Sequence, residues 1–396
     1  MSTIPAPVEH TPWVIVAGGF HQHGGMDRAN AALAAYLLES GVPVHLVGHE
    51  IDPGFVEDSR ATVHVVPRPR GLPGLSERLL GRTGSRVART VVARYPDARV
   101  VVNGGNCTWP DINWVHAVHA AWPVVDAGAP WWSRYRNRRL KAAAVQRERT
   151  SLQQAGLVIA NSETTRRALI ERVGVTAGRI RAVYLGSDPS WNAAGAEERA
   201  AARAALQLPP DRPVVLFVGA LGTDINKGFD VLWRSWLELT ASRRWDASLV
   251  VAGDGWRVPG WRAKAARSAG ADSVRFLGFT PDVRTVLAAG DLLVSPVRYE
   301  SYGLNVHEAL CRGLAVMVTR SAGVVERFDD SMREALLPDG IAPAQLAERL
   351  RSWRSDVLGW RTRAAATGAR LRARSWSDMA AELVALAQRT AEKASA

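Results

Sequence analysis

Two glutamates in the C-terminal half stand at a spacing that could bind hydroxyl groups. Glu300 follows a strand-like apolar run, and Glu308 lies eight residues later. Between them, Gly303 permits a tight turn and Asn305 is a residue type that can open a helix. Carboxylates placed on either side of such a turn could each accept hydrogen bonds from vicinal hydroxyls, one set on a sugar and one on a ribose. The alternative is a solvated carboxylate pair at a helix start, where acidic residues are favoured in any case.

A glycine pair near the N-terminus could approach an anion. Gly24 and Gly25 follow the apolar run at 13–19 and precede a stretch of helical spacing. Without side chains in the way, backbone N–H groups can come close to a diphosphate, and a helix N-terminus adds partial positive charge. Glycine pairs also make ordinary turns, so the pattern alone leaves both interpretations open. The neighbouring His21 and His23 are weaker candidates, because loop histidines beside glycines are commonly solvated.

The elements that must position these residues alternate between strand and helix types. Short apolar runs recur along the chain, and helical stretches such as 229–239 separate them. This alternation predicts an α/β fold with two Rossmann-like, doubly wound units, in which ligands bind at the carboxyl ends of parallel strands. The predicted strands are 13–19, 42–48, 61–67, 98–105, 112–119 and 157–162 in the first half, and 213–219, 247–253, 273–279, 291–297 and 314–319 in the second.

A turn-rich segment separates the two halves. Residues 185–195 read LGSDPSWNAAG, which predicts a linker. A final helix is predicted at 375–386, with Ser377 as its N-cap. We therefore expect one domain over 1–186 and a second over 187–375.

Composition restricts the classes of function. No stretch reaches the ~18 apolar residues that a membrane span needs, and the N-terminus lacks the layout of a secretory signal. The two cysteines, Cys107 and Cys311, indicate neither a disulfide framework nor a zinc cluster. We expect a cytoplasmic protein.

The net charge of +12 is spread along the chain of 396 residues, so it gives no reason to infer a nucleic-acid partner. The densest basic cluster follows Trp131 and Trp132. It predicts either a functional helix, which would lie at a membrane surface or face the acceptor, or a solvated helix face, which is the commoner outcome. A membrane-surface helix would place the protein peripherally at the inner membrane face. The cluster comprises Arg134, Arg136, Arg138, Arg139, Lys141, Arg147 and Arg149.

The segment at 298–313, RYESYGLNVHEALCRG, resembles the E-x7-E signature of the retaining GT-B glycosyltransferases called group 1 or GT4. Ala315 stands where the family usually has proline, a difference that affects a turn and not the chemistry. The residues that match the family pattern are Glu300, Tyr302, Gly303, Leu304, Glu308, Ala309, Gly313 and Val316.

Further segments resemble family motifs in the family's own order, over nearly the whole chain. The resemblance implies a GT-B fold whose two domains face a central cleft. The N-terminal domain would bind the acceptor and be completed by the C-terminal helix at about 376–396, while the C-terminal domain would bind the donor. The similar segments are the Gly24–Gly25 loop, 159–172, 182–189, 217–230, 250–255, 276–282 and 375–386.

One departure from the family concerns the cations that face the donor diphosphate. Ala220 stands where the family often has an arginine, whereas Lys227 keeps the family's Lys-Gly pair. The resemblance then implies a single cation at the diphosphate, with Arg298 as the candidate to assist it. Lys227 could instead be an ordinary surface lysine.

The family often has a histidine near the transferred sugar, and His116 and His119 both end the strand predicted at 112–119. The sequence does not decide which of them aligns, and a strand-end histidine is commonly structural. Taken together, the resemblance implies catalytic roles for Lys227, Glu300, His116 and His119; donor binding by Gly24, Gly25, Lys227, Gly278, Glu300, Ser301, Tyr302, Gly303, Leu304 and Glu308; and acceptor or interdomain contacts by Asn161, Ser162 and Arg298.

The activity that the resemblance implies is transfer of a hexose from GDP-mannose or a UDP-hexose to a hydroxyl, with retention and without a metal or other cofactor. The acceptor would be a carbohydrate, a lipid-linked molecule or a natural product. The alternatives are another GT-B enzyme, such as an epimerase or phosphorylase, and a non-catalytic nucleotide-sugar-binding protein, which Ala220 favours. A Rossmann NAD(P) enzyme is disfavoured, because the first loop, GGFHQHGGM, lacks the G-x-G-x-x-G pattern.

Overall fold

The chain divides into two compact units in the computed structural model. The division falls between Leu185 and Gly186 and again at Trp376, and it groups 121–138 with the second unit, whereas the sequence-based boundary had kept that segment in the first domain. Unit 1 comprises the chain up to Ala120, Arg139–Leu185 and the segment from Trp376 onward, and unit 2 comprises Ala121–Arg138 and Gly186–Ser375. The structure describes residues 11–22, 24–69, 71–123, 131–222, 225–242 and 244–395.

Unit 1 is built on a seven-stranded parallel sheet in the order β5-β3-β1-β6-β7-β8-β9. The order runs outward in both directions from the neighbouring strands β1 and β6, which makes this pair a topological switch point. Its core strands are buried along their full length, which explains why they read as continuous apolar runs. The strands are β1 (Trp13–Val16), β3 (Val44–Gly48), β5 (Ala61–Val65), β6 (Arg99–Asn103), β7 (Ile112–Val115), β8 (Leu157–Ala160) and β9 (Ile180–Ala182), with the short pair β2 (Gly19–Phe20) and β4 (Glu50–Ile51) beside them.

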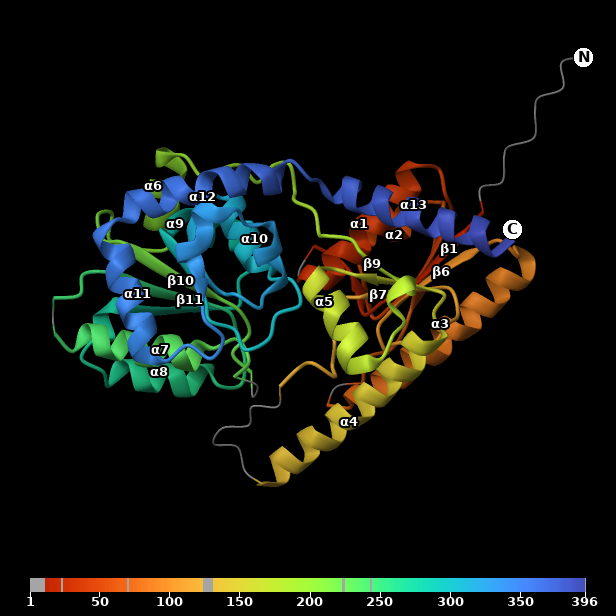
Figure 1. The fold of residues 1–396 in the computed structure, drawn as a ribbon, viewed down its shortest axis with the longest axis horizontal. Helices are drawn as coiled ribbons and strands as arrows, with labels where there is room; N and C mark the ends of the chain where they lie inside the picture. Colours follow the sequence, from red (N-terminus) through yellow and green to blue (C-terminus); the bar gives the residue numbers. More distant parts are fainter. Residues whose placement is uncertain are drawn as a thin grey trace, which may run out of the picture. The chain divides into compact units, whose positions relative to one another are not determined.

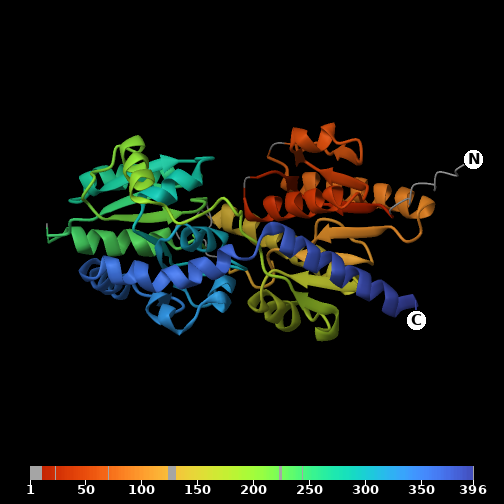
Figure 2. The same cartoon turned by 90° about the horizontal axis from the view of Figure 1, so that it is seen from above.

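The helices of unit 1 include one from the far end of the sequence. The C-terminal helix α13 packs against α1 (Figure 2). The guanidinium of Arg28 lies over the ring of Trp376. Because α13 begins at Trp376, Ser377 lies inside its first turn and is not the N-cap that we predicted. The helices are α1 (Gly25–Glu39), α2 (Pro53–Glu57), α3 (Pro73–Arg94), α4 (Trp131–Gln154, whose first turns cluster with unit 2), α5 (Glu163–Ala168) and α13 (Trp376–Ser395).

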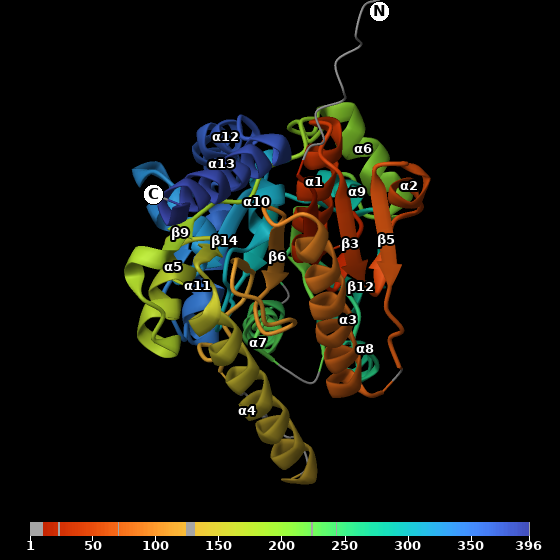
Figure 3. The same ribbon diagram turned by 90° about the vertical axis from the view of Figure 1, so that its right-hand side faces the viewer.

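Helix α3 illustrates how the helices of unit 1 pack on the sheet through an apolar face. Leu80, Val87, Ala88 and Val91 recur at helical spacing and bury one face of α3 against the valines of β1 and β6. Figure 3 shows α3 along the sheet of unit 1. Four arginines of α3, Arg78, Arg82, Arg86 and Arg89, are exposed.

Unit 2 repeats the plan with six strands in the order β12-β11-β10-β13-β14-β15, paired in parallel throughout. Its switch point lies between β10 and β13. All five strands predicted for this half are present, and the short β15 was not predicted. The strands are β10 (Val214–Val218), β11 (Ser248–Ala252), β12 (Val274–Gly278), β13 (Leu292–Ser295), β14 (Ala315–Thr319) and β15 (Leu336–Leu337).

Helices cover the sheet of unit 2 (Figure 1). Helix α7 follows β10 and α10 follows β13, so the two helices begin beside the switch point. The predicted α/β fold with two Rossmann-like units is therefore confirmed. The helices are α6 (Ala196–Ala205), α7 (Phe229–Thr240), α8 (Val258–Ala266), α9 (Val283–Ala289), α10 (Leu304–Cys311), α11 (Pro343–Ser355) and α12 (Val357–Arg372).

Candidate functional site

The loops after β10 and β13 lie side by side at the switch point of unit 2. The amide of Arg298 donates to the carbonyl of Asn226 at 2.8 Å, and the side-chain Nδ2 of Asn226 donates to the carbonyl of Tyr299 at 2.8 Å. These bonds join the segment that carries Lys227 to the segment that carries Glu300. Open α/β sheets bind ligands at this position.

Gly228 allows the two loops to come this close. It has a φ of 74° and caps the start of α7, and a Cβ at this position would lie 1.9 Å from the carbonyl oxygen of Pro296. Any side chain would push the loops apart. The Lys-Gly pair that the sequence singled out therefore has a structural reason, and the glycine fixes the backbone position of Lys227.

Lys227 and Glu300 meet as an ion pair. The distance from Nζ to Oε2 is 2.6 Å, and the side chains are 33% and 15% exposed respectively. An ammonium has three N–H donors, so Lys227 can hold Glu300 and still donate to a second anion. The structure thus brings together Lys227 and Glu300, two of the three residues on which the sequence-based site depended; the third is Glu308.

Arg298 has a different partner from the one we expected. Its guanidinium forms two bonds with the carboxylate of Asp230 in the first turn of α7, at 2.9 and 2.8 Å, and it also donates to the carbonyl of Ile225. Such a bidentate pair between a guanidinium and a carboxylate fixes the relative orientation of the two side chains. Arg298 therefore anchors the Lys227 loop, and its roles as an assisting cation or an acceptor or interdomain contact stay predictions. Sequence reasoning missed Asp230.

Helix α10 begins at Leu304, directly after a left-handed Gly303 with a φ of 103°. A Cβ on Gly303 would lie 3.3 Å from Val324 and 3.4 Å from Glu300. The predicted role of Asn305 as the helix-opening residue was wrong: it lies in the first turn, and its Nδ2 donates to the carbonyl of Val218 at 2.9 Å. This bond ties α10 to the end of β10.

The remaining residues of the E-x7-E segment differ in their exposure. Ser301 and Tyr302 are buried, whereas Leu304 is half-buried. Glu308 is also half-buried and lies one turn into α10, four residues after the helix begins.

A buried chain of hydrogen bonds supports this segment from behind. The hydroxyl of Tyr302 lies 2.7 Å from Nδ1 of His307, and Nε2 of His307 lies 2.6 Å from the hydroxyl of Ser187, which donates to the carbonyl of Leu371 at 2.8 Å. Burial lowers the pKa of His307 to about 3, so the ring is neutral. Because the hydroxyl of Ser187 donates its proton to the carbonyl of Leu371, it can only accept from His307. Nε2 of His307 therefore carries the ring proton, and Nδ1 accepts a hydrogen bond from the hydroxyl of Tyr302. Sequence analysis did not identify Ser187 or His307.

The loops after β11 and β12 pack backbone against backbone. Gly278 has a φ of 82°, and its carbonyl accepts from the amide of Gly253 at 2.8 Å. Gly253 in turn has a φ of 141°, and a Cβ there would lie 2.0 Å from the carbonyl oxygen of Gly219. Only glycines permit this approach, which leaves Gly278 at the same strand-end edge as Lys227.

In unit 1, Gly24 caps α1 with a φ of 80°, and Gly25 is the first helical residue. Asp27 follows in the first turn, and Nε2 of His21 lies 3.8 Å from its carboxylate and 3.5 Å from that of Glu50. Burial raises the pKa of Asp27, which makes it easier to protonate this carboxyl beside an incoming anion. His23 lies outside the described residues.

The two candidate histidines of unit 1 have different surroundings, and both lie beyond β7, which ends at Val115. His116 packs on Trp114 with ring centroids 4.5 Å apart, and its Nε2 is enclosed. Burial lowers the pKa of His116 to about 3, so it is neutral.

His119 is 47% exposed, and its Nδ1 lies 3.1 Å from a carboxylate oxygen of Glu148. Glu148 is fully buried and also accepts the amides of His119 and Ala120, at 2.8 and 3.2 Å. Glu148 therefore holds the turn and orients the ring. Of the two histidines, His119 is the more exposed.

Asn161 and Ser162 are buried supports of the strand ends. The Oγ of Ser162 caps α5 by accepting the amide of Thr165 at 3.0 Å, and Asn161 accepts the hydroxyl of Thr165 and donates to the carbonyl of His116. Their side chains are at most 2% exposed. The acceptor or interdomain contacts expected of these two residues stay predictions.

No cluster of three or more residues of the metal-ligating types His, Cys, Asp and Glu occurs within the described part of the chain. The chemistry that the switch point of unit 2 can perform is the binding of an anion by a partly exposed ammonium, next to a carboxylate able to accept from hydroxyls.

Two family descriptions match this chain, and together they span most of it. Residues 23–191 match "Glycosyltransferase Family 4", and residues 212–356 match "Glycosyl transferases group 1".

Two curated relatives illustrate the sequence similarity. A D-inositol 3-phosphate glycosyltransferase 2 of Catenulispora acidiphila is 35% identical over 207 residues, which is 49% of this chain and 46% of that protein. An alpha-D-kanosaminyltransferase of Streptomyces kanamyceticus is 29% identical over 208 residues, 51% of this chain and 53% of that protein. The matches thus span about half the length of these relatives.

Solved structures share the fold at low sequence identity. The glycosyltransferase WaaG, involved in lipopolysaccharide biosynthesis, has a TM-score of 0.73 at 19% identity, covering 94% of this chain and 99% of that one. The Anabaena protein HepE in complex with UDP-glucose has a TM-score of 0.68 at 19% identity, covering 98% and 100%. These neighbours confirm that the two Rossmann-like units form a GT-B fold.

Proposed function

We propose, from the premise that this chain belongs to the group 1 glycosyltransferases of family 4, that it transfers a hexose from a nucleoside-diphosphate sugar to a hydroxyl acceptor with retention of configuration. The observation that carries this proposal is the Lys227–Glu300 pair at the switch point of unit 2. A partly exposed cation and a carboxylate are held there by a glycine contact and by the Arg298–Asp230 pair.

The donor is proposed to bind in unit 2, with its diphosphate at Lys227 and its sugar hydroxyls at Glu300. Glu308 is proposed to accept from the ribose, and the Gly278 loop to lie beside the base. A UDP-glucose complex of a protein with the same fold supports a nucleoside-diphosphate sugar as donor, and GDP-mannose and UDP-hexoses are the candidates to test.

In the proposed reaction, the bond between the sugar C1 and the leaving phosphate oxygen breaks, and a bond from C1 to the acceptor oxygen forms on the same face of the ring. The acceptor proton passes to an oxygen of the departing diphosphate. Lys227 stabilises the charge that develops on that diphosphate, so no metal is required. This mechanism uses no side-chain nucleophile.

Unit 1 is proposed to bind the acceptor. His119 is the histidine proposed to contact the acceptor or the sugar, because its ring is half exposed and oriented by Glu148, whereas His116 is neutral with its Nε2 enclosed. Gly24 and Gly25 at the start of α1 are proposed to approach the diphosphate.

Peripheral contact with a membrane surface is a further part of the proposal. Within the described residues, no helix is both long enough and apolar enough to cross a bilayer. The side chains of Trp131, Trp132 and Tyr135 on α4 are 74%, 55% and 59% exposed beside the basic cluster, and aromatic rings flanked by arginines suit a lipid interface.

The experiment is a thermal-shift screen of nucleoside diphosphates and their sugars, followed by transfer assays with the labelled donor that stabilises most. We expect transfer of label to a hydroxyl acceptor, with undiminished rate in EDTA. Loss of transfer in EDTA that added metal restores would overturn the metal-free mechanism. Tight donor binding without any turnover would instead favour a non-catalytic binding protein, and epimerised or phosphorolysed sugar would favour the other enzymes of this fold.

A further inference from the structure

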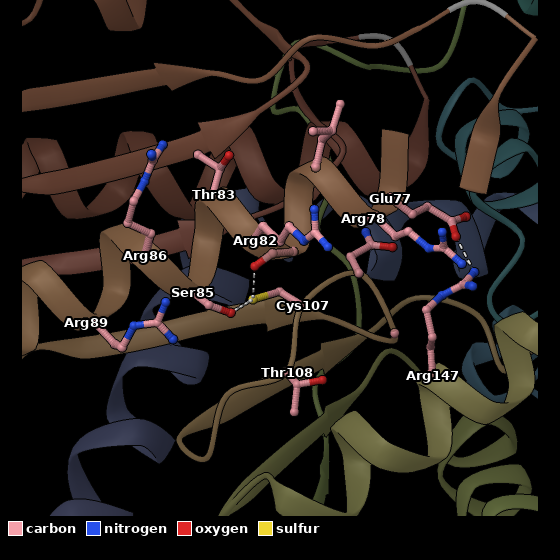
Figure 4. Close-up of a pocket in the computed structure, with 14 residues that line it drawn as sticks. Glu77, Arg78, Arg82, Thr83, Ser85, Arg86, Arg89, Cys107, Thr108 and Arg147 are labelled. Atoms are coloured by element: carbon pink, nitrogen blue, oxygen red, sulfur yellow. Dashed lines mark hydrogen bonds and ion pairs between the residues drawn. The ribbon is translucent and has the colours of Figure 1, made fainter. Parts of the chain in front are cut away.

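A cavity of about 720 Å³ lies in unit 1, and none of its residues belongs to the Lys227–Glu300 site. Helix α3 forms one wall, the loop after β6 forms the floor, and Arg147 closes one end from α4 (Figure 4). Its charged lining is five arginines and the single acid Glu77, which is bound to Arg147. The arginines are Arg78, Arg82, Arg86, Arg89 and Arg147.

Four of these arginines form a stripe on one face of α3. Arg78, Arg82 and Arg86 recur every fourth residue, and Arg89 continues the row three residues later. All four are exposed, since the opposite face of α3 is buried against the sheet.

The stripe has no counter-charge in the part of unit 1 that the structure describes. Glu77 is the sole acidic residue of α3 and is taken by Arg147, and no other described side chain pairs with the four arginines. Elsewhere in the chain, arginines commonly pair with carboxylates, as Arg99 does with Asp111 and Arg199 with Asp291. Like charges one helical turn apart repel each other, so an unneutralised row lowers helix stability unless an external anion binds to it.

The floor of the cavity is rigid and polar. A Cβ on Gly81 would lie 2.9 Å from the carbonyl oxygen of Asn106, and a Cβ on Gly105 would lie 2.9 Å from the amide nitrogen of Glu148. These contacts press the loop after β6 against both α3 and α4. Cys107 in this loop is buried, and its Sγ lies 3.4 Å from the hydroxyl of Ser85. Asn106 and Thr108 contribute further polar groups to the lining of the cavity.

The length of the stripe indicates how many charges the ligand carries. With a rise of about 1.5 Å per residue, the eleven steps from Arg78 to Arg89 span roughly 16 Å, which is too far for one phosphate to reach both ends. Guanidinium groups match phosphate oxygens in geometry and remain charged at all working pH values. None of the fourteen lining residues is aromatic, so the cavity lacks the stacking surfaces that single-stranded nucleic acids use.

We propose that this arginine groove, defined by Arg78, Arg82, Arg86, Arg89 and Arg147, binds a ligand that carries two or more phosphate groups. The site is separate from the proposed donor site, and its test involves no sugar transfer. The same chemistry could come from a soluble polyphosphorylated molecule or from the headgroups of an anionic phospholipid surface, and the experiment distinguishes these two sources.

The test uses the whole chain and the double variant Arg82→Gln with Arg86→Gln. Both residues are exposed and glutamine is a comparable helix former, so the fold is retained, which thermal melting verifies. The matched control removes the same charge elsewhere, as Arg267→Gln with Arg389→Gln. Both arginines are exposed, one directly after α8 and one on α13, and the structure describes no side-chain partner for either.

Calorimetric titration with myo-inositol hexakisphosphate measures the soluble arm, and co-sedimentation with phosphatidylcholine vesicles, with and without phosphatidylglycerol, measures the lipid arm. We expect the groove variant to bind at least about tenfold more weakly in one arm or both, while the Arg267/Arg389 control binds like the parent protein. Loss in the soluble arm alone assigns a soluble ligand, and loss in the vesicle arm alone assigns a lipid headgroup. The proposal is overturned if neither probe binds the parent protein, or if the groove variant and the Arg267/Arg389 control lose binding equally.

Discussion

The ammonium of Lys227 lies 2.6 Å from the carboxylate of Glu300, although 73 residues separate them in sequence. Neighbouring contacts impose this relationship: the Gly228 approach to Pro296 and the Asn226 bond to Tyr299 join the two loops. In the proposed reaction the pair presents one cation and one hydroxyl acceptor at fixed positions before the donor arrives. Groups oriented in advance stabilise a developing charge without the cost of reorganisation.

Replacing Gly228 with alanine tests whether the loop contact sets this geometry. Its Cβ would meet the Pro296 carbonyl at 1.9 Å, and a φ of 74° strains alanine. We expect Gly228→Ala to lower the free energy of unfolding by about 1–3 kcal/mol and to reduce transfer sharply. Urea unfolding and a transfer assay measure these effects.

Gly178→Ala is the control for this variant, because Gly178 does not have a left-handed backbone and has open space around its Cβ position. We expect that control to change little. Equal stability and activity in both variants would show that the close approach of Gly228 to Pro296 does not determine the geometry of the Lys227–Glu300 site.

The Arg298–Asp230 pair is expected to stabilise the loop more than a surface ion pair would. Its side chains are 25% and 18% exposed and form two parallel bonds. A double-mutant cycle on unfolding, with Arg298→Ala and Asp230→Ala, should give a coupling energy of about 1–2 kcal/mol.

The exposed pair Arg351–Glu238 is the matched comparison, since its side chains are 52% and 41% exposed and solvent screens their charges. Its cycle should give about 0.5 kcal/mol or less. A coupling for Arg298–Asp230 no larger than this value would remove its proposed anchoring role.

The neutral His307 predicts how stability changes with pH. Its pKa is lowered from 6.5 to about 3 in the folded protein, so below pH 6.5 the unfolded chain binds a proton that the folded chain does not. The stabilisation of the folded protein by the neutral His307 is therefore fully present above pH 6.5. As the pH falls toward 3 this part of the free energy of unfolding is lost, at up to about 1.4 kcal/mol for each pH unit.

His307→Gln should flatten the dependence of unfolding free energy on pH between 6 and 4, relative to the parent protein. Measurements at pH 7.5, where the histidine is neutral in both folded and unfolded states, give the packing loss alone. An unchanged slope in the variant would mean that His307 is protonated in the folded protein, and the tautomer assigned through Ser187 and Tyr302 would be incorrect.

Much of the fold could be predicted because parallel core strands are buried on both faces and read as apolar runs. β7 shows the limit: its pattern continued past Val115, so His116 and His119 were placed on the strand although the chain turns there. Turn geometry depends on which groups cap the strand end, and here the cap is Glu148, which lies far along the chain.

Sequence patterns predicted only those parts of the site whose residues lie close together along the chain. Glu300, Gly303 and Glu308 share one loop and helix, so their spacing was visible. The partner of Arg298 is 68 residues away, and His307 meets a serine 120 residues away. Such contacts depend on which strand ends come together in the sheet, which local spacing does not encode.

The measurement that tests the account most directly is the transfer rate of Lys227→Ala with saturating donor, compared with Lys264→Ala. Lys264 lies on α8 of the same unit, with its ammonium over the ring of Trp261, so Lys264→Ala matches the loss of one lysine. We predict that Lys227→Ala loses roughly a hundredfold or more in kcat while its thermal unfolding is unchanged, and that Lys264→Ala keeps its rate. A folded Lys227→Ala protein that transfers sugar at the parent rate would contradict the role of this lysine in stabilising the departing diphosphate.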